Sequence, residues 1–153
     1  MSVNGLTSGM STRLTYSINE LSTALDAYAD RILQARWGVT ISQFTFLAVL
    51  EEGQPIDVTH LAECLGVTKA AVSKRVPVLV GKGLVQTQPD PANARRVVLT
   101  LTEAGLRLAR EAGDVLEAEF EDMFVDRPDL DLERIHADVL ALLGTVLSKE
   151  SAR

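Results

Sequence analysis

Apolar residues recur at alternating intervals of four and three in the early part of the chain. Those between residues 14 and 35 are Leu14, Ile18, Leu21, Leu25, Tyr28, Ile32 and Ala35. This spacing places them along one narrow stripe of a single long helix that ends at Gly38. A stripe that narrow is typical of packing against other helices rather than of burial in a small core.

Three shorter helices follow, and each begins at a residue whose side chain can cap a helix. These residues are Thr40, Asp57 and Thr68. The first of the three carries a capping-box pattern, because Gln43 lies three residues after the cap, and it ends near Gly53. Gly66 and Val67 form the tight turn between the second and the third, which runs to about Lys82.

After Gly83 the pattern changes to one typical of strands, and two long helices come after it. Residues 84–88 and 96–101 are β-prone, and residues 89–94 have the composition of a hairpin tip. Thr102 then caps a helix whose apolar stripe is Leu106, Ala109, Gly113, Leu116, Phe120 and Met123. Pro128 ends that helix, and the last helix is marked by Leu132, Ile135, Val139, Leu142 and Val146. The predicted fold is mainly α, with six helices and a two-stranded hairpin between the fourth and the fifth.

The composition is that of an ordinary globular protein of about one domain: 153 residues, 46% apolar and 24% charged. No apolar run approaches the roughly 20 residues of a membrane span. Residues 1–12 have the composition of a flexible arm and lack a secretory signal pattern. The only cysteine, Cys64, cannot form a disulfide within the chain, which is compatible with a cytoplasmic location.

Charge is distributed unevenly along the chain. The net charge is −6, but residues 66–102 carry six basic side chains and one acidic one, whereas the balance is −4 over residues 1–65 and −7 over residues 103–153. A basic segment between acidic flanks is typical of an anion-binding patch, and a chance cluster on a solvated face is the alternative.

Catalysis finds little support in the sequence. There is no glycine-rich phosphate loop, nucleophile elbow or HExxH pattern. His60, His136 and Cys64 are too few for a zinc site of the usual kind. We therefore expect neither an enzyme nor a metal or other cofactor.

Residues 58–82 have the spacing of a helix-turn-helix. Ala62 is small enough to lie where two helices cross, Gly66 four residues later supplies the turn, and Val72 six residues further on packs back between the helices. An ordinary helical hairpin can share this spacing. The basic hairpin that follows favours the winged form of the motif.

Five segments resemble successive signatures of the MarR family: residues 40–44, 61–67, 72–76, 79–85 and 99–105. The resemblance extends from about residue 13 to the end. It implies a winged helix-turn-helix DNA-binding domain over residues 37–102 and a helical dimerisation region made of residues 13–36 and 103–150. It further implies a transcription regulator that binds double-stranded DNA as a homodimer on a pseudo-palindromic operator. Many members are repressors that a small phenolic or other ligand releases.

A candidate DNA-binding site follows from the helix that starts after Thr68. Its face opposite the apolar positions carries Lys69, Ala70, Ser73, Lys74 and Pro77. Ser73 and Lys74 can reach base edges, and Thr68 with the helix N-terminus suits a phosphate. Arg95 and Arg96, at the expected tip of the hairpin, suit phosphate or a narrow minor groove.

Two departures from the family pattern favour a second interpretation. Asn93 stands where the family usually has an aspartate that orients the wing arginine. Pro77 lies inside the recognition helix, where proline costs about 3 kcal/mol and kinks a helix, so its last two turns are expected to be weakened. With the acidic total, these residues favour a winged-helix protein-interaction module that has lost DNA binding.

Three further side chains are candidates for a functional role. Cys64 is interpreted as a packed or inert thiol rather than a peroxide sensor, since no cation stands beside it except His60. Trp37 and Tyr28 could line a ligand pocket at the junction of the first two helices, but large aromatic residues at such junctions usually belong to the core.

Overall fold

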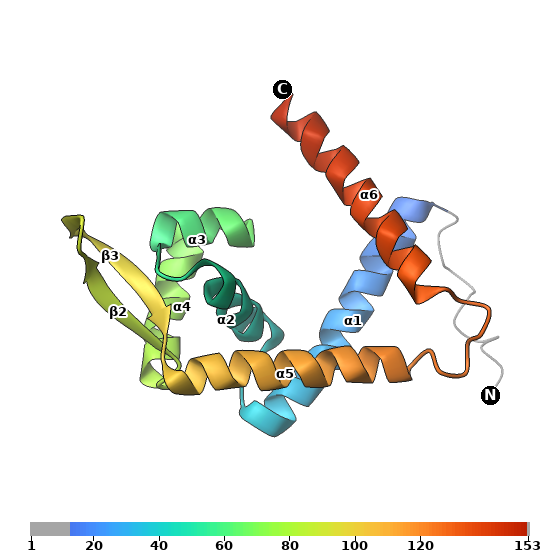
Figure 1. Ribbon diagram of the computed structural model, residues 1–153, viewed down its shortest axis with the longest axis horizontal. Helices are drawn as coiled ribbons and strands as arrows, with labels where there is room; N and C mark the ends of the chain where they lie inside the picture. The colour runs from blue at the N-terminus through green and yellow to red at the C-terminus, as the bar shows by residue number, and fades with distance from the viewer. Residues whose placement is uncertain (1–12, 153) are drawn as a thin grey trace. The chain divides into compact units, whose positions relative to one another are not determined.

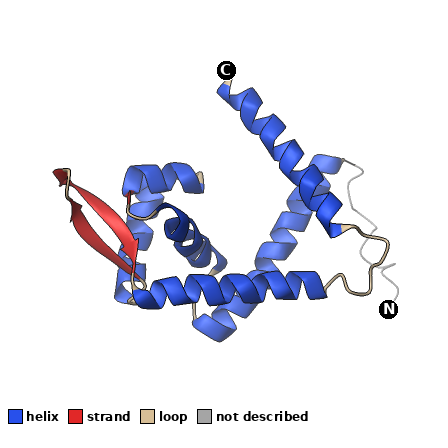
Figure 2. Ribbon diagram, in the orientation of Figure 1, coloured by secondary structure: helices blue, strands red, loops and turns tan. Residues whose placement is uncertain are grey.

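The structure is a computed structural model that describes residues 13–152; the predicted arm at residues 1–12 lies outside them. Two compact units are present, one ending at Leu116 and the other beginning at Glu117. The elements are α1 (Leu14–Trp37), α2 (Ile41–Gly53), β1 (Ile56–Asp57), α3 (Val58–Leu65), α4 (Lys69–Gly81), β2 (Val85–Asp90), β3 (Asn93–Leu101), α5 (Glu103–Asp122) and α6 (Leu132–Ser151) (Figures 1 and 2). The predicted order of helices and hairpin is confirmed, with β1 added.

The helices begin at the residues that the sequence indicated. Thr40 Oγ1 accepts a hydrogen bond from the Gln43 amide at 3.1 Å, and Gln43 Oε1 accepts one from the Thr40 amide at 3.0 Å, which completes the capping box of α2. Asp57 caps α3 and Thr68 caps α4 through bonds of 2.8 and 3.1 Å to main-chain amides. Gly66, with a φ of 64°, closes the turn between α3 and α4 in the left-handed region where glycine is favoured.

The hairpin belongs to a three-stranded antiparallel sheet with the order β1-β3-β2. The third strand, β1, pairs Ile56 with Leu99 and Asp57 with Val98. β1 could not be predicted from the sequence, because a strand of two residues is too short to show alternating apolar and polar positions.

The hairpin strands are longer than predicted, so the six-residue tip expected at residues 89–94 is wrong. Pairing continues to Pro89, which lies opposite Val97, and the register then shifts so that Asp90 lies opposite Asn93 and residues 94–96 of β3 have no partner in β2. Residues 91 and 92 turn the chain. Proline is compatible with β2 because β2 is an edge strand, where the missing amide need not face a neighbour. As a result Arg95 and Arg96 lie within β3 and not at the tip.

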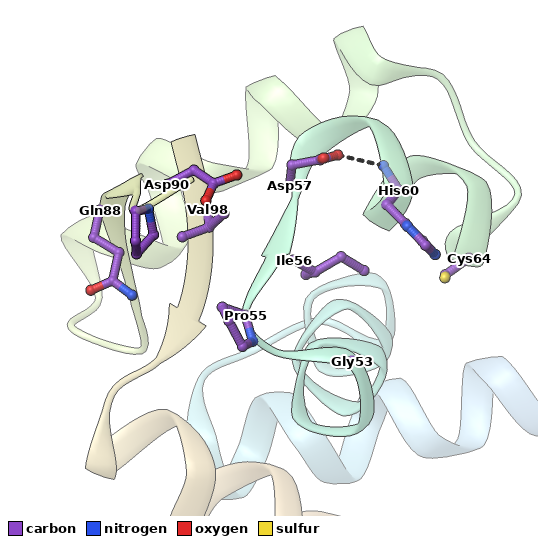
Figure 3. A pocket seen from close by; sticks show the side chains of 10 residues that line it. Gly53, Pro55, Ile56, Asp57, His60, Cys64, Gln88, Asp90 and Val98 are labelled. Carbon is purple, nitrogen blue, oxygen red and sulfur yellow. Dashed lines mark hydrogen bonds between the residues drawn. The ribbon is translucent and has the colours of Figure 1, made fainter. Parts of the chain in front are cut away.

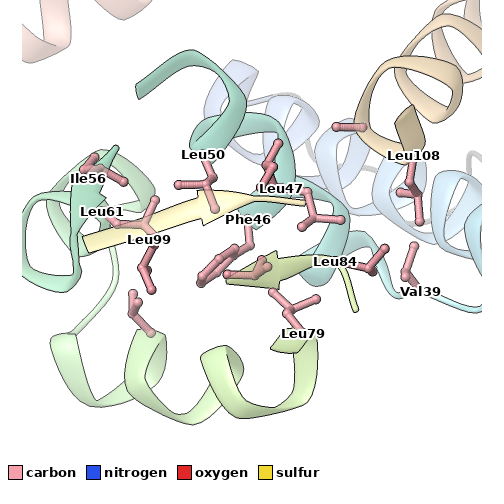
Figure 4. Close-up of a cluster of buried hydrophobic side chains, with 14 of the residues drawn as sticks. Val39, Phe46, Leu47, Leu50, Ile56, Leu61, Leu79, Leu84, Leu99 and Leu108 are labelled. Carbon is pink, nitrogen blue, oxygen red and sulfur yellow. The ribbon is translucent and has the colours of Figure 1, made fainter. Parts of the chain in front are cut away.

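The core of the first unit gathers around α2 (Figure 4). Its fully buried large side chains include Leu33, Phe46, Leu47, Leu50, Leu61, Val72, Leu79 and Leu99. They come from α1, α2, α3, α4 and β3. Burial of each such side chain contributes about 1.5–3 kcal/mol, so α4 is held by hydrophobic contacts along its inner face.

Pro77 does not end α4, which continues as a helix to Gly81. The last two turns, which the sequence predicts to be weakened, are helical. Val72 and Leu79, on either side of the proline, are both fully buried. Their combined burial is comparable with the roughly 3 kcal/mol that an internal proline costs, so packing keeps the last turn helical.

In the half of α5 that lies in the first unit, the predicted apolar stripe faces the core, since Ala109 is buried and Leu106 and Leu116 pack against the core. The buried face is wider than predicted, because Gly105, Leu108 and Ala112 are buried as well. Small residues bring this face close to its neighbours. A Cβ atom added at Gly105 would lie 1.9 Å from the main-chain oxygen of Leu84.

The second unit contains the end of α5, a turn and α6. The rings of Phe120 and Phe124 lie 5.0 Å apart. In the turn, Arg127 donates hydrogen bonds of 2.9 and 2.8 Å to the carboxylate of Asp129, which holds the pKa of that carboxyl below its ordinary value. No helix within residues 13–152 is long and apolar enough to cross a membrane.

We expect Gly105→Ala to destabilise the protein by about 2–3 kcal/mol or more, because the added methyl group would meet main-chain atoms that cannot move aside cheaply. Gly113→Ala is the matched control on the same helix. Its Cβ would lie 4.0 Å from the Phe44 ring, and loss of a helical glycine should stabilise by about 0.4–1 kcal/mol. Urea denaturation measures both values, and equal effects for the two variants would contradict the close packing at Gly105.

Candidate nucleic-acid interface

The face of α4 that turns away from the core is the one predicted from the sequence. All five of its residues are exposed: Lys69, Ala70, Ser73, Lys74 and Pro77. Thr68 is also exposed, with its hydroxyl oxygen bonded to the Ala71 amide as the N-cap. Since Val72 and Leu79 fix the opposite face in the core, the rotation of α4 about its axis is set by packing.

The outward face of α4 is divided along its length. Its first two turns carry Lys69, Ser73 and Lys74, which offer ammonium and hydroxyl groups to solvent. Toward the other end come Pro77, Val78 and Val80, and the two valines are 48% and 42% exposed. The hydrogen-bonding capacity of the helix is therefore concentrated near its N-terminus.

Two cations of the basic segment have structural partners that the sequence did not reveal. Lys82 Nζ donates a hydrogen bond of 2.8 Å to the main-chain oxygen of Gly38, so it ties the end of α4 to the end of α1. The guanidinium of Arg96 forms an ion pair with Asp57. Both contacts join residues about 40 positions apart, and local sequence patterns carry no signal for them.

Arg95 is exposed and sits next to Arg96 on β3. Arg96 is paired with Asp57, so the two arginines differ in their surroundings although they are neighbours in the sequence. Asn93 Oδ1 accepts a hydrogen bond from the Arg95 amide at 3.1 Å. The asparagine therefore shapes the main chain before Arg95 rather than orienting its guanidinium group. Among residues 13–152, the side chains of Lys69, Lys74 and Arg95 have no ion-pair partner.

The junction of α1 and α2 contains a contact that sequence reasoning missed. Asp30 Oδ1 accepts a hydrogen bond of 2.7 Å from the Ile41 amide at the start of α2. Trp37 is half-buried and packs against the core, in agreement with the prediction that it is a core residue. The guanidinium of Arg31 lies 5.6 Å from the centre of the Tyr28 ring.

A cavity of about 390 Å³ lies between α3 and the sheet (Figure 3). Its lining includes Asp57, His60, Cys64, Asp90 and Val98. Figure 3 shows His60 and Cys64 on the same side of α3, one turn apart. Cys64 is exposed, so its interpretation as a packed thiol is wrong. Within the described part of the chain, no three His, Cys, Asp or Glu side chains are arranged to hold a metal ion.

A helix pair with a glycine turn, an outward-facing second helix and a hairpin directly after it together define a winged helix-turn-helix protein. Proteins of this class place their second helix in the major groove of DNA. Residues 37–96 match the sequence profile of the MarR family. Over these residues the chain is similar to the MarR family, as the sequence motifs indicated.

Known proteins similar to this chain are transcription regulators rather than enzymes. The regulator TcaR of Staphylococcus aureus is 27% identical over 114 residues, which cover 73% of this chain and 75% of TcaR. The transcriptional repressor NicR of Pseudomonas putida is 34% identical over 70 residues, which cover 46% of this chain and 44% of NicR. The chain thus spans less than half the length of NicR and of some other curated regulators that it matches.

Solved structures share the fold. MepR of S. aureus, in the crystal structure of its complex with DNA, aligns with a TM-score of 0.72 over 89% of this chain and 99% of the MepR chain, at 24% identity. The agreement confirms the predicted winged-helix fold with its flanking long helices.

We expect Cys64 to react fully with a thiol reagent such as Ellman's reagent in the folded protein, because the residue is exposed. Denaturant should leave the number of reactive thiols per chain unchanged, and Cys64→Ser should remove the signal while changing the free energy of unfolding by less than about 0.5 kcal/mol. A thiol that reacts only after unfolding would instead support the packed interpretation.

Proposed function

We propose that the chain is a sequence-specific DNA-binding transcription regulator that acts as a homodimer. The observation that carries the proposal is the outward face of α4, where Lys69, Ser73 and Lys74 lie exposed on a helix whose other face is fixed by the core. A rigid helix that presents donors on one side fits the major groove of B-DNA, which is wide enough to admit it.

The roles that we assign within this face follow from the chemistry of each side chain. Lys74 and Ser73 read base edges, the lysine toward the O6 and N7 acceptors of guanine. Thr68, Lys69 and the small Ala70 lie at the N-terminus of α4, where main-chain amides and a cation favour a phosphate. Arg95 on the wing contacts a phosphate or a narrow minor groove.

The proposed dimer rests on apolar side chains that α1 and α6 leave exposed. On α1, Leu14, Ile18 and Leu21 are 64%, 47% and 56% exposed. The corresponding residues of α6 are Ile135, Val139, Leu140, Leu142, Leu143, Val146 and Leu147, all exposed by 42% to 55%. So many apolar residues on two helices mark an interface, and a second copy of the chain is the occupant that gives a two-fold protein for a two-fold operator.

We further propose repression as the mode of action and a small phenolic or similar molecule as effector. NicR is described as a repressor, which supports the first part. A regulator of this kind works in the compartment that holds the DNA, the cytoplasm.

The second candidate function is a protein-interaction module without DNA binding. It is favoured by the exposed Val78 and Val80 beside Pro77, which give the end of α4 an apolar surface rather than a basic one. The two candidates differ in the role of Arg95 and Lys74, because a protein-interaction module that does not bind DNA has no need of these two cations.

A binding selection on genomic fragments provides the operator, and salt titrations on it test the proposal. Each phosphate contact contributes about 0.9 to the slope of log affinity against log salt, so Arg95→Ala should flatten the slope of a dimer by about 1.8. Lys74→Ala should blur discrimination at one or two base pairs per half-site, by about 1–3 kcal/mol each.

Arg107→Ala, which removes an exposed arginine of α5 outside the proposed DNA-binding face, is the control for the change in net charge. If Arg95→Ala and Lys74→Ala both change operator affinity and salt slope no more than this control while the fold is intact, the protein-interaction module becomes the better-supported function.

We expect sedimentation to find a dimer at micromolar concentration, and Leu143→Glu to convert it to monomer. Two unpaired carboxylates in an apolar interface cost several kcal/mol. Asp138→Asn, a change at an exposed polar position of the same helix, should leave the dimer intact. A stably folded parent monomer at that concentration would contradict the proposed assembly.

A further inference from the structure

Asp57 makes two contacts at once, one with each of its carboxylate oxygens. Oδ1 accepts the hydrogen bond from the His60 amide that caps α3. Oδ2 forms the ion pair with the Arg96 guanidinium. The aspartate side chain is only 14% exposed, whereas that of Arg96 is 55% exposed. One carboxylate thus joins the start of the helix-turn-helix to the wing.

The strand register explains why these two residues meet. Asp57 lies directly opposite Val98. Arg96 is two residues from Val98 along β3, so it lies on the same face of the sheet and diagonal to Asp57. Diagonal neighbours in antiparallel strands are within reach of long side chains.

The ion pair extends the attachment of the wing toward its tip. The β1 strand ends at Asp57, so Val97 pairs only with β2, and residues 94–96 that follow toward the tip have no partner in either strand. An isolated two-stranded hairpin is marginally stable. Arg96 reaches back from a point about 7 Å beyond the last β1 pairing, at 3.3–3.4 Å per residue.

We propose that Arg96 is a positioning residue that clamps the wing to α3 through Asp57, while the neighbouring, exposed Arg95 makes the DNA contact. This assignment replaces the sequence-based hypothesis that both arginines bind DNA, and it rests on the proposed DNA-binding function. The clamp holds the height and angle at which each wing presents Arg95 to the duplex.

The test is a double-mutant cycle on operator affinity with Arg96→Gln, Asp57→Asn and the double variant. Asparagine caps a helix about as well as aspartate, so Asp57→Asn removes the charge and keeps the cap. Each single variant should weaken binding by about 1.4- to 5-fold per wing, the range for an exposed ion pair, or about 2- to 25-fold for two wings. The double variant should be no weaker than either single one.

The sign of the Asp57→Asn effect separates the clamp from a direct contact. Removal of a negative charge near DNA strengthens binding by simple electrostatics, whereas loss of the clamp weakens it. Arg96→Gln should leave the salt slope unchanged, and Arg96→Lys should restore part of the affinity. Tighter binding by Asp57→Asn, a flattened slope for Arg96→Gln or additive losses would each overturn the proposal.

Hydrogen exchange on the protein without DNA gives an independent readout. Amides of β2 and β3 should exchange faster in Arg96→Gln and Asp57→Asn, to the same extent and without further increase in the double variant. Lys82→Gln removes the cation that is hydrogen-bonded to Gly38, and it should leave the exchange rates of the β2 and β3 amides unchanged. Unchanged exchange in both single variants overturns the clamp. If the parent protein binds no DNA, the proposed function is overturned. The exchange experiment still tests the clamp, because it is done without DNA.

Discussion

The inner face of α4 is the contact on which the rest of the first unit depends. Val72 and Leu79 are fully buried beside Phe46 of α2, and the same contact fixes which face of the helix solvent meets. It also offsets the cost of Pro77, so α4 continues as a helix past the proline. The site is therefore a consequence of the core: Lys69, Ser73 and Lys74 are exposed because their neighbours on the helix are not.

Features with local causes could be predicted from the sequence. The caps at Thr40, Asp57 and Thr68 and the turn at Gly66 need only residues within a few positions of one another, and all are present. Features that join distant segments could not be predicted. Examples are β1 and the partners of Arg96 and Lys82, which depend on how elements pack rather than on any periodicity.

Contacts between distant segments also change the interpretation of the basic segment, residues 66–102. Its six cations suggested a patch, but charge counted along the chain does not say which groups face solvent without a partner. Lys82 is bonded to Gly38 and Arg96 is paired with Asp57. Those two cations hold the framework, and the exposed Lys69, Lys74 and Arg95 remain for an anionic ligand.

The two adjacent arginines of the wing differ in their partners. Arg96 is paired with Asp57, whereas the Arg95 side chain is exposed and has no ion-pair partner among the described residues. Asn93, bonded to the Arg95 amide, can shape the main chain but supplies no charge to hold the Arg95 side chain. The main chain of the wing must then set the position of Arg95, which is the property that an ion pair at the next residue controls.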